Sequence, residues 1–159
     1  MKPFIAIIGN RNSGKSTIIR SLTGATTAQF RGTIQDLTTN QTMEVIGSSP
    51  QERPLALADL RTLLRTAAGT ATCRGVVCAL QPNAPTKRLS MEQVLREAAS
   101  QGFIIHTYVL DPGYSGATGR AGIVTTRIQN AGFYSQVLDG QRFAHINAAT
   151  INAQTNIAT

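Results

Sequence analysis

A glycine-bounded turn between an apolar segment and a helical pattern, close to the first residue, constrains the fold more than any other feature. The run Phe4-Ile-Ala-Ile-Ile-Gly9 is short and rich in isoleucine, which is typical of a strand buried on both faces of a mostly parallel sheet. Apolar side chains then recur at helical spacing from Lys15 until Gly24 ends the pattern. The sequence therefore predicts a strand, a tight loop and a helix in direct succession.

The loop reads Gly9-Asn-Arg-Asn-Ser-Gly-Lys-Ser16 and fits the pattern G-x-x-x-x-G-K-[ST] at every fixed position. Its glycines let the backbone curl so that successive N–H groups point at phosphate oxygens, and the helix N-terminus adds the positive end of its dipole. We therefore expect a nucleoside triphosphate here, with Lys15 between the β- and γ-phosphates, Ser16 on Mg²⁺ and Thr17 at the α-phosphate. The residues expected to bind the nucleotide are Gly9, Asn10, Arg11, Asn12, Ser13, Gly14, Lys15, Ser16 and Thr17.

The rest of the chain alternates strand and helix patterns. Two threonine-containing segments, 33–39 and 42–46, flank a polar turn and predict an antiparallel hairpin. The later strands are expected at 75–80, 103–110 and 133–138, and the later helices at 55–68, 90–102 and 117–131. This alternation predicts a three-layer α/β domain whose sheet is mostly parallel, with one antiparallel hairpin, over residues 1–146. Residues 147–159, rich in Asn, Ala, Thr and Gln, are expected to form a polar C-terminal tail.

Composition narrows the classes of protein. The 159 residues suit one domain, and no apolar run approaches the roughly 20 residues that a membrane-spanning helix needs, so we expect a cytoplasmic protein without a membrane span. Fifteen basic against eight acidic residues give a net charge of +7, which suits nucleic acid, an acidic membrane surface or phosphorylated ligands, although no nucleic-acid motif is visible. Cys73 and Cys78 stand far from both histidines in sequence, and we expect both thiols to be reduced and structural.

The stretch from Ile7 to Gly24 resembles the opening of the Era-like, translation-factor-related GTPases of the P-loop NTPase superfamily. The segment Arg31–Asp36 is similar to the stretch before the second strand of that family, in which a threonine closes over Mg²⁺ in the triphosphate state. The resemblance implies a P-loop NTPase fold that binds ATP or GTP with Mg²⁺. It also implies that Thr33 joins Lys15 as a catalytic residue and joins Ser16 as a ligand of the metal.

The chain departs from two motifs of that family. Where the family has a strand-terminal Asp-x-x-Gly, Gly47 stands in the place of the aspartate and Pro50 in that of the glycine. The segment Leu110–Gly113, which follows an expected strand, stands where the family has the guanine-reading Asn-Lys-x-Asp. The choice between ATP and GTP and the competence for hydrolysis therefore stay open.

Two further residues have alternative interpretations. Asp111 closes an apolar strand and is a candidate magnesium ligand if that strand lies beside the first one, whereas the plain alternative is an aspartate that opens the turn before Pro112. Arg31 is close to Thr33 and is a candidate arginine finger acting in cis, the alternative being a solvated side chain.

Three functions fit these observations. The first is a nucleotide-controlled switch and Mg²⁺-dependent NTP hydrolase, in which segments 25–32 and 47–54 move when the γ-phosphate is lost. The second is an ATP-dependent kinase of a small molecule or nucleotide, with Arg120 and Arg127 as a phosphate-covering lid. The third is a basic, nucleic-acid-associated accessory ATPase. The sequence favours the switch, because no acceptor site and no nucleic-acid motif is readable.

Overall fold

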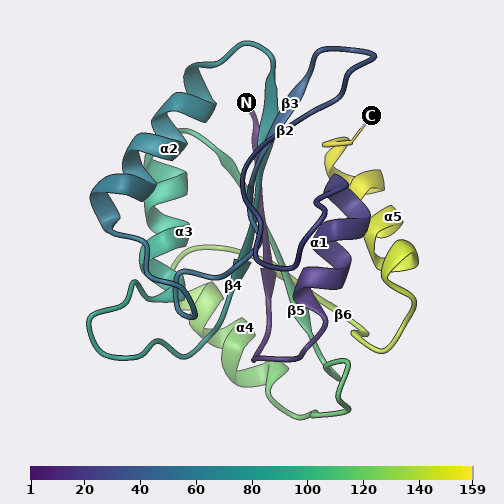
Figure 1. Cartoon of the computed structure of the whole chain (residues 1–159). Coiled ribbons are helices and arrows are strands. Elements are labelled where there is room, and N and C mark those ends of the chain that lie inside the picture. Colours follow the sequence, from purple (N-terminus) through teal and green to yellow (C-terminus); the bar gives the residue numbers. More distant parts are fainter. Residues whose placement is uncertain (159) are drawn as a thin grey trace.

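A six-stranded sheet lies between two layers of helices in the computed structural model, which describes residues 1–158 (Figure 1). The strands are β1 (Pro3–Ile8), β2 (Arg31–Gln35), β3 (Thr42–Ile46), β4 (Cys73–Leu80), β5 (Ile104–Leu110) and β6 (Ser135–Leu138). The helices are α1 (Lys15–Thr23), α2 (Leu57–Gly69), α3 (Met91–Ser100), α4 (Ala121–Asn130) and α5 (Ala144–Thr155). The order across the sheet is β2-β3-β4-β1-β5-β6, and β2 with β3 is the antiparallel pair. The predicted three-layer α/β class is confirmed.

Burial on both faces explains why β1 is an unbroken apolar run. Phe4, Ala6 and Ile8 point into the core that lies under α2, α3 and α4. Ile5 and Ile7 point into the opposite core, which lies under α1 and α5. All five side chains are fully buried, as expected of a central strand in a parallel sheet with helices on both sides.

Local signals set two helix ends where the sequence predicts them. Gly24 follows α1 with φ 80° and donates its N–H to the carbonyl of Arg20 at 2.8 Å, the left-handed ending that glycine favours. At the start of α3, Ser90 Oγ accepts from the Gln93 N–H while Gln93 Oε1 accepts from the Ser90 N–H. These two reciprocal hydrogen bonds form a capping box, and they start the helix where the sequence predicts it.

Two predicted elements are shorter in the structure. β2 ends at Gln35 because Asp36 turns the chain, its carboxylate accepting from the N–H groups of Thr38 and Thr39. The helix expected from residue 117 begins at Ala121, after Gly116 and Gly119 adopt φ values of 89° and 85°. Positive φ at both glycines is incompatible with a helical start at these positions.

The expected boundary between residues 146 and 147 falls inside α5. Asn147, Ala148 and Ile151 are buried in this helix, which packs against α1 on the right of Figure 1. Asn147 also donates from Nδ2 to the carbonyl of Asp139 at 2.9 Å. Residues 144–155 are therefore part of the folded layer rather than of a separate tail.

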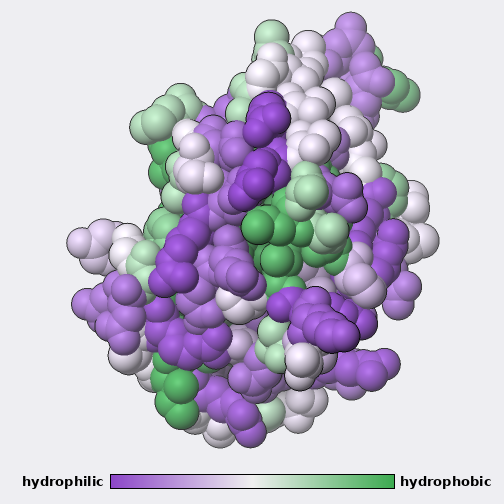
Figure 2. Space-filling model, turned by 90° about the vertical axis from the view of Figure 1, so that its left-hand side faces the viewer, coloured by the Kyte–Doolittle hydropathy of each residue, from purple (hydrophilic) through white to green (hydrophobic). Residues whose placement is uncertain are grey.

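The surface and the thiols complete the description of the fold. Figure 2 shows a mostly hydrophilic face with a small hydrophobic area near its middle.

Cys73 and Cys78 are both free and buried, and burial raises the pKa of the Cys78 thiol to about 12. Within residues 1–158, no helix has both the length and the apolar character needed to cross a bilayer.

Candidate functional site

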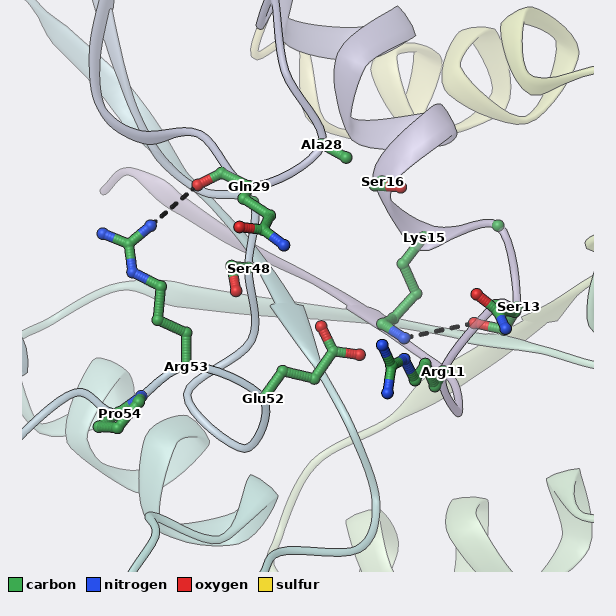
Figure 3. Close-up of a pocket in the computed structure, with 13 residues that line it drawn as sticks. Arg11, Ser13, Lys15, Ser16, Ala28, Gln29, Ser48, Glu52, Arg53 and Pro54 are labelled. Atoms are coloured by element: carbon green, nitrogen blue, oxygen red, sulfur yellow. Dashed lines mark hydrogen bonds between the residues drawn. The ribbon is translucent and has the colours of Figure 1, made fainter.

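The sheet topology gathers several loops at one edge. β1, β3, β4, β5 and β6 run parallel, so their carboxyl ends meet there. Between the loop after β1 and the segments before β2 and after β3 lies a cavity of about 610 Å³. Its walls, shown in Figure 3, are residues 11–16, 28–29, 47–48 and 52–54.

The backbone of the glycine loop is curled as its sequence predicts. Asn12 and Gly14 have φ values of 62° and 94°, and the Ser13 N–H donates to the carbonyl of Asn10 at 3.1 Å. Gly14 is the N-cap of α1, which has neither a side-chain cap nor an acidic residue in its first turn. The positive end of the helix therefore opens toward the cavity without a carboxylate from its own helix.

Lys15 is the buried cation of this site. Only 6% of the residue is exposed, and Nζ donates to the carbonyl of Asn10 at 2.7 Å and to Ser13 Oγ at 3.5 Å. Burial lowers the pKa of Lys15 to about 8, an effect that the charge of Glu52 opposes. Neither salt bridge found among the described residues includes this ammonium group, so it lacks the close anionic partner that a buried charge needs. An anionic ligand in the cavity would supply that partner.

Gly9 is required by its contact with the loop it begins. A Cβ at this position would lie 2.3 Å from Ser13 Oγ and 2.8 Å from Ser13 Cβ. We expect Gly9→Ala to displace Ser13 and to weaken triphosphate binding by about tenfold or more, which corresponds to about 1.4 kcal/mol, the size of one lost hydrogen bond to the phosphates. Titration with a fluorescent triphosphate measures the effect.

Gly122→Ala is the matched control for that substitution. Gly122 lies in α4, and a Cβ added there would have no neighbouring atom within 4 Å. Alanine at this position should leave binding unchanged and raise the free energy of unfolding by up to about 1 kcal/mol. Equal binding by Gly9→Ala and the unchanged protein would show that the loop tolerates the displacement.

The other residues predicted for the site are not all in the cavity. Ser16 is half-buried and lines it. Thr17 is exposed and does not line it. Thr33 is exposed on β2, outside the cavity, where its Oγ1 donates to Glu44 Oε1 at 2.5 Å. The structure thus places Ser16, but neither threonine, against the space beside Lys15.

Asp111 follows a strand that lies beside β1, as a magnesium ligand would, but its carboxylate is used in local hydrogen bonds. Its strand β5 does pair directly with β1. The carboxylate, however, accepts from the N–H of Ala121 at 3.0 Å and from that of Gly119 at 3.2 Å, outside the cavity. These hydrogen bonds, that of Ala121 foremost, lower the pKa of the Asp111 carboxyl. The geometry favours the local turn and helix-start alternative.

Arg31 holds the segment after β3 in place. Its guanidinium donates to the carbonyls of Ser48 and Ser49, and to those of Arg53 and Pro54, at distances from 2.6 to 3.2 Å. Burial lowers the pKa of this guanidinium. The donors of Arg31 are directed at the backbone, so this geometry favours neither an arginine finger nor a solvated side chain.

The structure explains why Gly47 stands where the resembled family has an aspartate. A Cβ at Gly47 would lie 2.8 Å from the carbonyl of Phe30 and 3.2 Å from that of Ala28, so no side chain fits. β4 also separates β3 from β1, which puts the end of β3 about 10 Å from β1 at ordinary strand spacing.

Sequence reasoning missed the carboxylate that does lie in the cavity. Glu52, six residues after β3, lines it and points toward Lys15 and Arg11 in Figure 3. Its Oε1 accepts a hydrogen bond from Gln81 Nε2 at the end of β4. No local sequence signal marks Glu52 and Gln81 as partners. They meet because β4, which Gln81 follows, pairs with both β1 and β3.

The curled loop, the buried lysine and the cavity at the carboxyl edge of the sheet define a P-loop nucleotide-binding domain. The family model described as 50S ribosome-binding GTPase matches residues 4–110. The chain therefore belongs to that GTPase family.

One solved structure shows the same fold. It is the solution NMR structure of a de novo designed protein with the P-loop NTPase fold, and the match covers 98% of this chain and 96% of the designed one. The TM-score is 0.53 at 11% sequence identity, which shows a shared fold alone. No curated protein matches this sequence.

Proposed function

We propose that this protein binds GTP with Mg²⁺ and acts as a nucleotide-controlled switch that hydrolyses the bound triphosphate slowly. The observation that carries the proposal is Lys15, a buried ammonium group at the N-terminus of α1 that faces a polar cavity without a close carboxylate partner. Triphosphate oxygens would supply that partner, and membership of the GTPase family favours GTP.

The residues at the cavity are compatible with Mg²⁺. Ser16 offers a hydroxyl oxygen beside the expected phosphates. Among the residues that the structure describes, no three His, Cys, Asp or Glu side chains gather into a metal site. In nucleotide sites Mg²⁺ keeps several waters and binds the phosphates of the substrate, so it needs few protein ligands. The metal would neutralise phosphate charge there.

Two segments opposite the loop are linked to each other, which supports the switch. The Gly47 N–H donates to the carbonyl of Phe30 at 2.7 Å, and Arg53 donates to the carbonyl of Gln29 at 3.1 Å (dashed in Figure 3). Both segments line the cavity. Loss of the γ-phosphate would remove contacts from both, and their shared hydrogen bonds would make them move together.

The alternatives have less support from the residues. Arg127, considered for a kinase lid, is bound to Glu92 at 2.6 Å and to the carbonyl of Pro82 at 2.6 Å. Arg120 is exposed at the start of α4, outside the cavity. Neither arrangement forms a phosphate-covering lid. Binding of nucleic acid and a cytoplasmic location stay predictions.

Competition titration of a fluorescent triphosphate with GTP and ATP, with and without Mg²⁺ and at two salt concentrations, tests the proposal. GTP that competes at least tenfold better than ATP, and better with Mg²⁺ than without, supports the switch. ATP preference would favour the kinase or accessory ATPase. Failure of both nucleotides to compete would overturn nucleotide binding itself.

A further inference from the structure

The carboxylate of Glu52 lies in the cavity on the side opposite the phosphate-binding loop. It points toward Lys15 and Arg11 from the segment after β3 (Figure 3), while the space between them belongs to the cavity. Among the described residues, Glu52 is the one carboxylate that lines this cavity. A γ-phosphate held by Lys15 would therefore face Glu52.

One hydrogen bond orients the exposed side chain of Glu52, and others hold its backbone. Gln81 Nε2 donates to Glu52 Oε1. Gln81 follows β4 directly, and the preceding residue, Leu80, accepts from the Gly9 N–H at 3.1 Å, so the end of β4 is attached to the start of the loop. The Glu52 N–H donates to the carbonyl and to Oγ of Ser49, which holds its backbone as well.

A buried amide ties the two segments together. Gln51, 2% exposed, accepts at Oε1 from the Gln81 N–H at 2.8 Å and donates from Nε2 to the carbonyl of Leu89 at 2.7 Å. Both ends of the amide are used, and the amide cannot rotate without leaving a buried polar group unsatisfied. Glu52 therefore follows directly after Gln51, a residue that is held in place by its hydrogen bond to Gln81 at the end of β4.

We propose that Glu52 orients the water that attacks the γ-phosphate and accepts its proton, with Gln81 as the positioning residue of the carboxylate. This rests on the proposed triphosphate binding. The water oxygen forms a bond to the γ-phosphorus while the bond from that phosphorus to the β–γ bridging oxygen breaks. The nucleoside diphosphate leaves with the electron pair, the water proton passes to Glu52 and then to solvent, and inorganic phosphate is released.

The negative charge of Glu52 should affect hydrolysis and triphosphate binding in opposite directions, which allows the two to be told apart. A carboxylate near a triphosphate repels it, whereas the same carboxylate hydrogen-bonds an attacking water. Removing the charge should therefore lower the rate of hydrolysis and leave binding equal or tighter. A group that merely supported the fold would lower both.

Single-turnover phosphate release and triphosphate affinity are measured for the wild type, Glu52→Gln and Glu44→Gln. Glu44 is the matched control, a half-buried glutamate on β3 that lies outside the cavity. We expect Glu52→Gln to release phosphate at least about 100-fold more slowly than the wild type. Its affinity should stay within about threefold or rise, and its bound nucleotide should be recovered as triphosphate, with Glu44→Gln like the wild type.

Gln81→Ala provides a second readout that does not depend on the stability of Glu52→Gln. It should slow phosphate release by about tenfold with binding retained, since the carboxylate stays but loses its orienting partner. Unchanged phosphate release in Glu52→Gln, or parallel loss of binding and hydrolysis, overturns the role of Glu52. A wild-type protein that binds triphosphate but never hydrolyses it also overturns this role and leaves the proposed binding intact.

Discussion

Lys15→Ala is expected to weaken triphosphate binding by at least about 100-fold, which corresponds to about 2.7 kcal/mol. The ammonium group is the buried cation that faces the cavity, and hydrogen bonds between charged partners contribute about 1.5–3 kcal/mol each. Binding of the diphosphate should fall less, because the γ-phosphate contact is already missing. Titrations with both nucleotides measure the two effects.

The same substitution should leave the nucleotide-free fold as stable as before, or more stable. Burial lowers the pKa of Lys15 to about 8, so the fold disfavours the charged form and alanine removes that unfavourable desolvation. Urea unfolding without nucleotide checks this expectation. A marked loss of stability together with the loss of binding would indicate that the lysine supports the fold instead.

Lys87→Ala is the control for the change in net charge. Lys87 is exposed and lies outside the cavity. Its removal lowers the net charge by the same one unit, and affinity should stay within about twofold, as expected for a distant solvent-screened charge. Equal loss of affinity in both variants would mean that general charge, rather than the position of Lys15, attracts the nucleotide.

Arg31→Ala is expected to release the segment after β3 and to lower the free energy of unfolding by about 3 kcal/mol. Its guanidinium makes five hydrogen bonds to four backbone carbonyls, and their loss leaves several acceptors without a partner. The N–H groups of Glu52 and Arg53, which donate to Ser49, should then exchange with solvent faster. Hydrogen exchange and urea unfolding provide the two measurements.

Arg31→Lys and Arg53→Ala sharpen that experiment. Lysine keeps the charge but cannot reproduce the planar fork, so we expect most of the alanine effect. Arg53 makes one hydrogen bond to this region, at Gln29, and its removal should cost less than about 1 kcal/mol. Unchanged hydrogen exchange in Arg31→Ala, combined with a collapse of phosphate release, would instead show that Arg31 acts on the transition state.

Local patterns were enough to predict the central strand, the phosphate loop and the helix after it. The unbroken apolar run of β1, the left-handed Gly14 and the ending of α1 at Gly24 can be recognised from residues within a few positions of each other. The capping box of Ser90 and Gln93 is equally local. Such signals consist of spacing and residue type, and for this reason they can be predicted without knowledge of the sheet.

The helix α5 shows where local signals end. Its sequence is mostly Ala, Asn, Thr and Gln, with Ile146 and Ile151 among them, and has little amphipathic pattern. The helix is buried against α1 through Ala148 and Ile151. Tertiary packing rather than propensity stabilises such a helix. Periodicity alone therefore predicts a tail.

The distribution of acidic residues around the site depended on tertiary structure as well. The family resemblance suggests Thr33 as a metal ligand, and its place at the end of an apolar strand suggests Asp111, yet Thr33 lies on the edge strand β2 and Asp111 accepts hydrogen bonds from the loop before α4 and from its first residue. Glu52 stands in a segment without a recognisable motif and lies in the cavity. The pattern of a strand indicates on which face of the sheet each side chain lies, but not which strands are neighbours. Here β4 lies between β1 and β3, and this strand order decided which carboxylate faces Lys15.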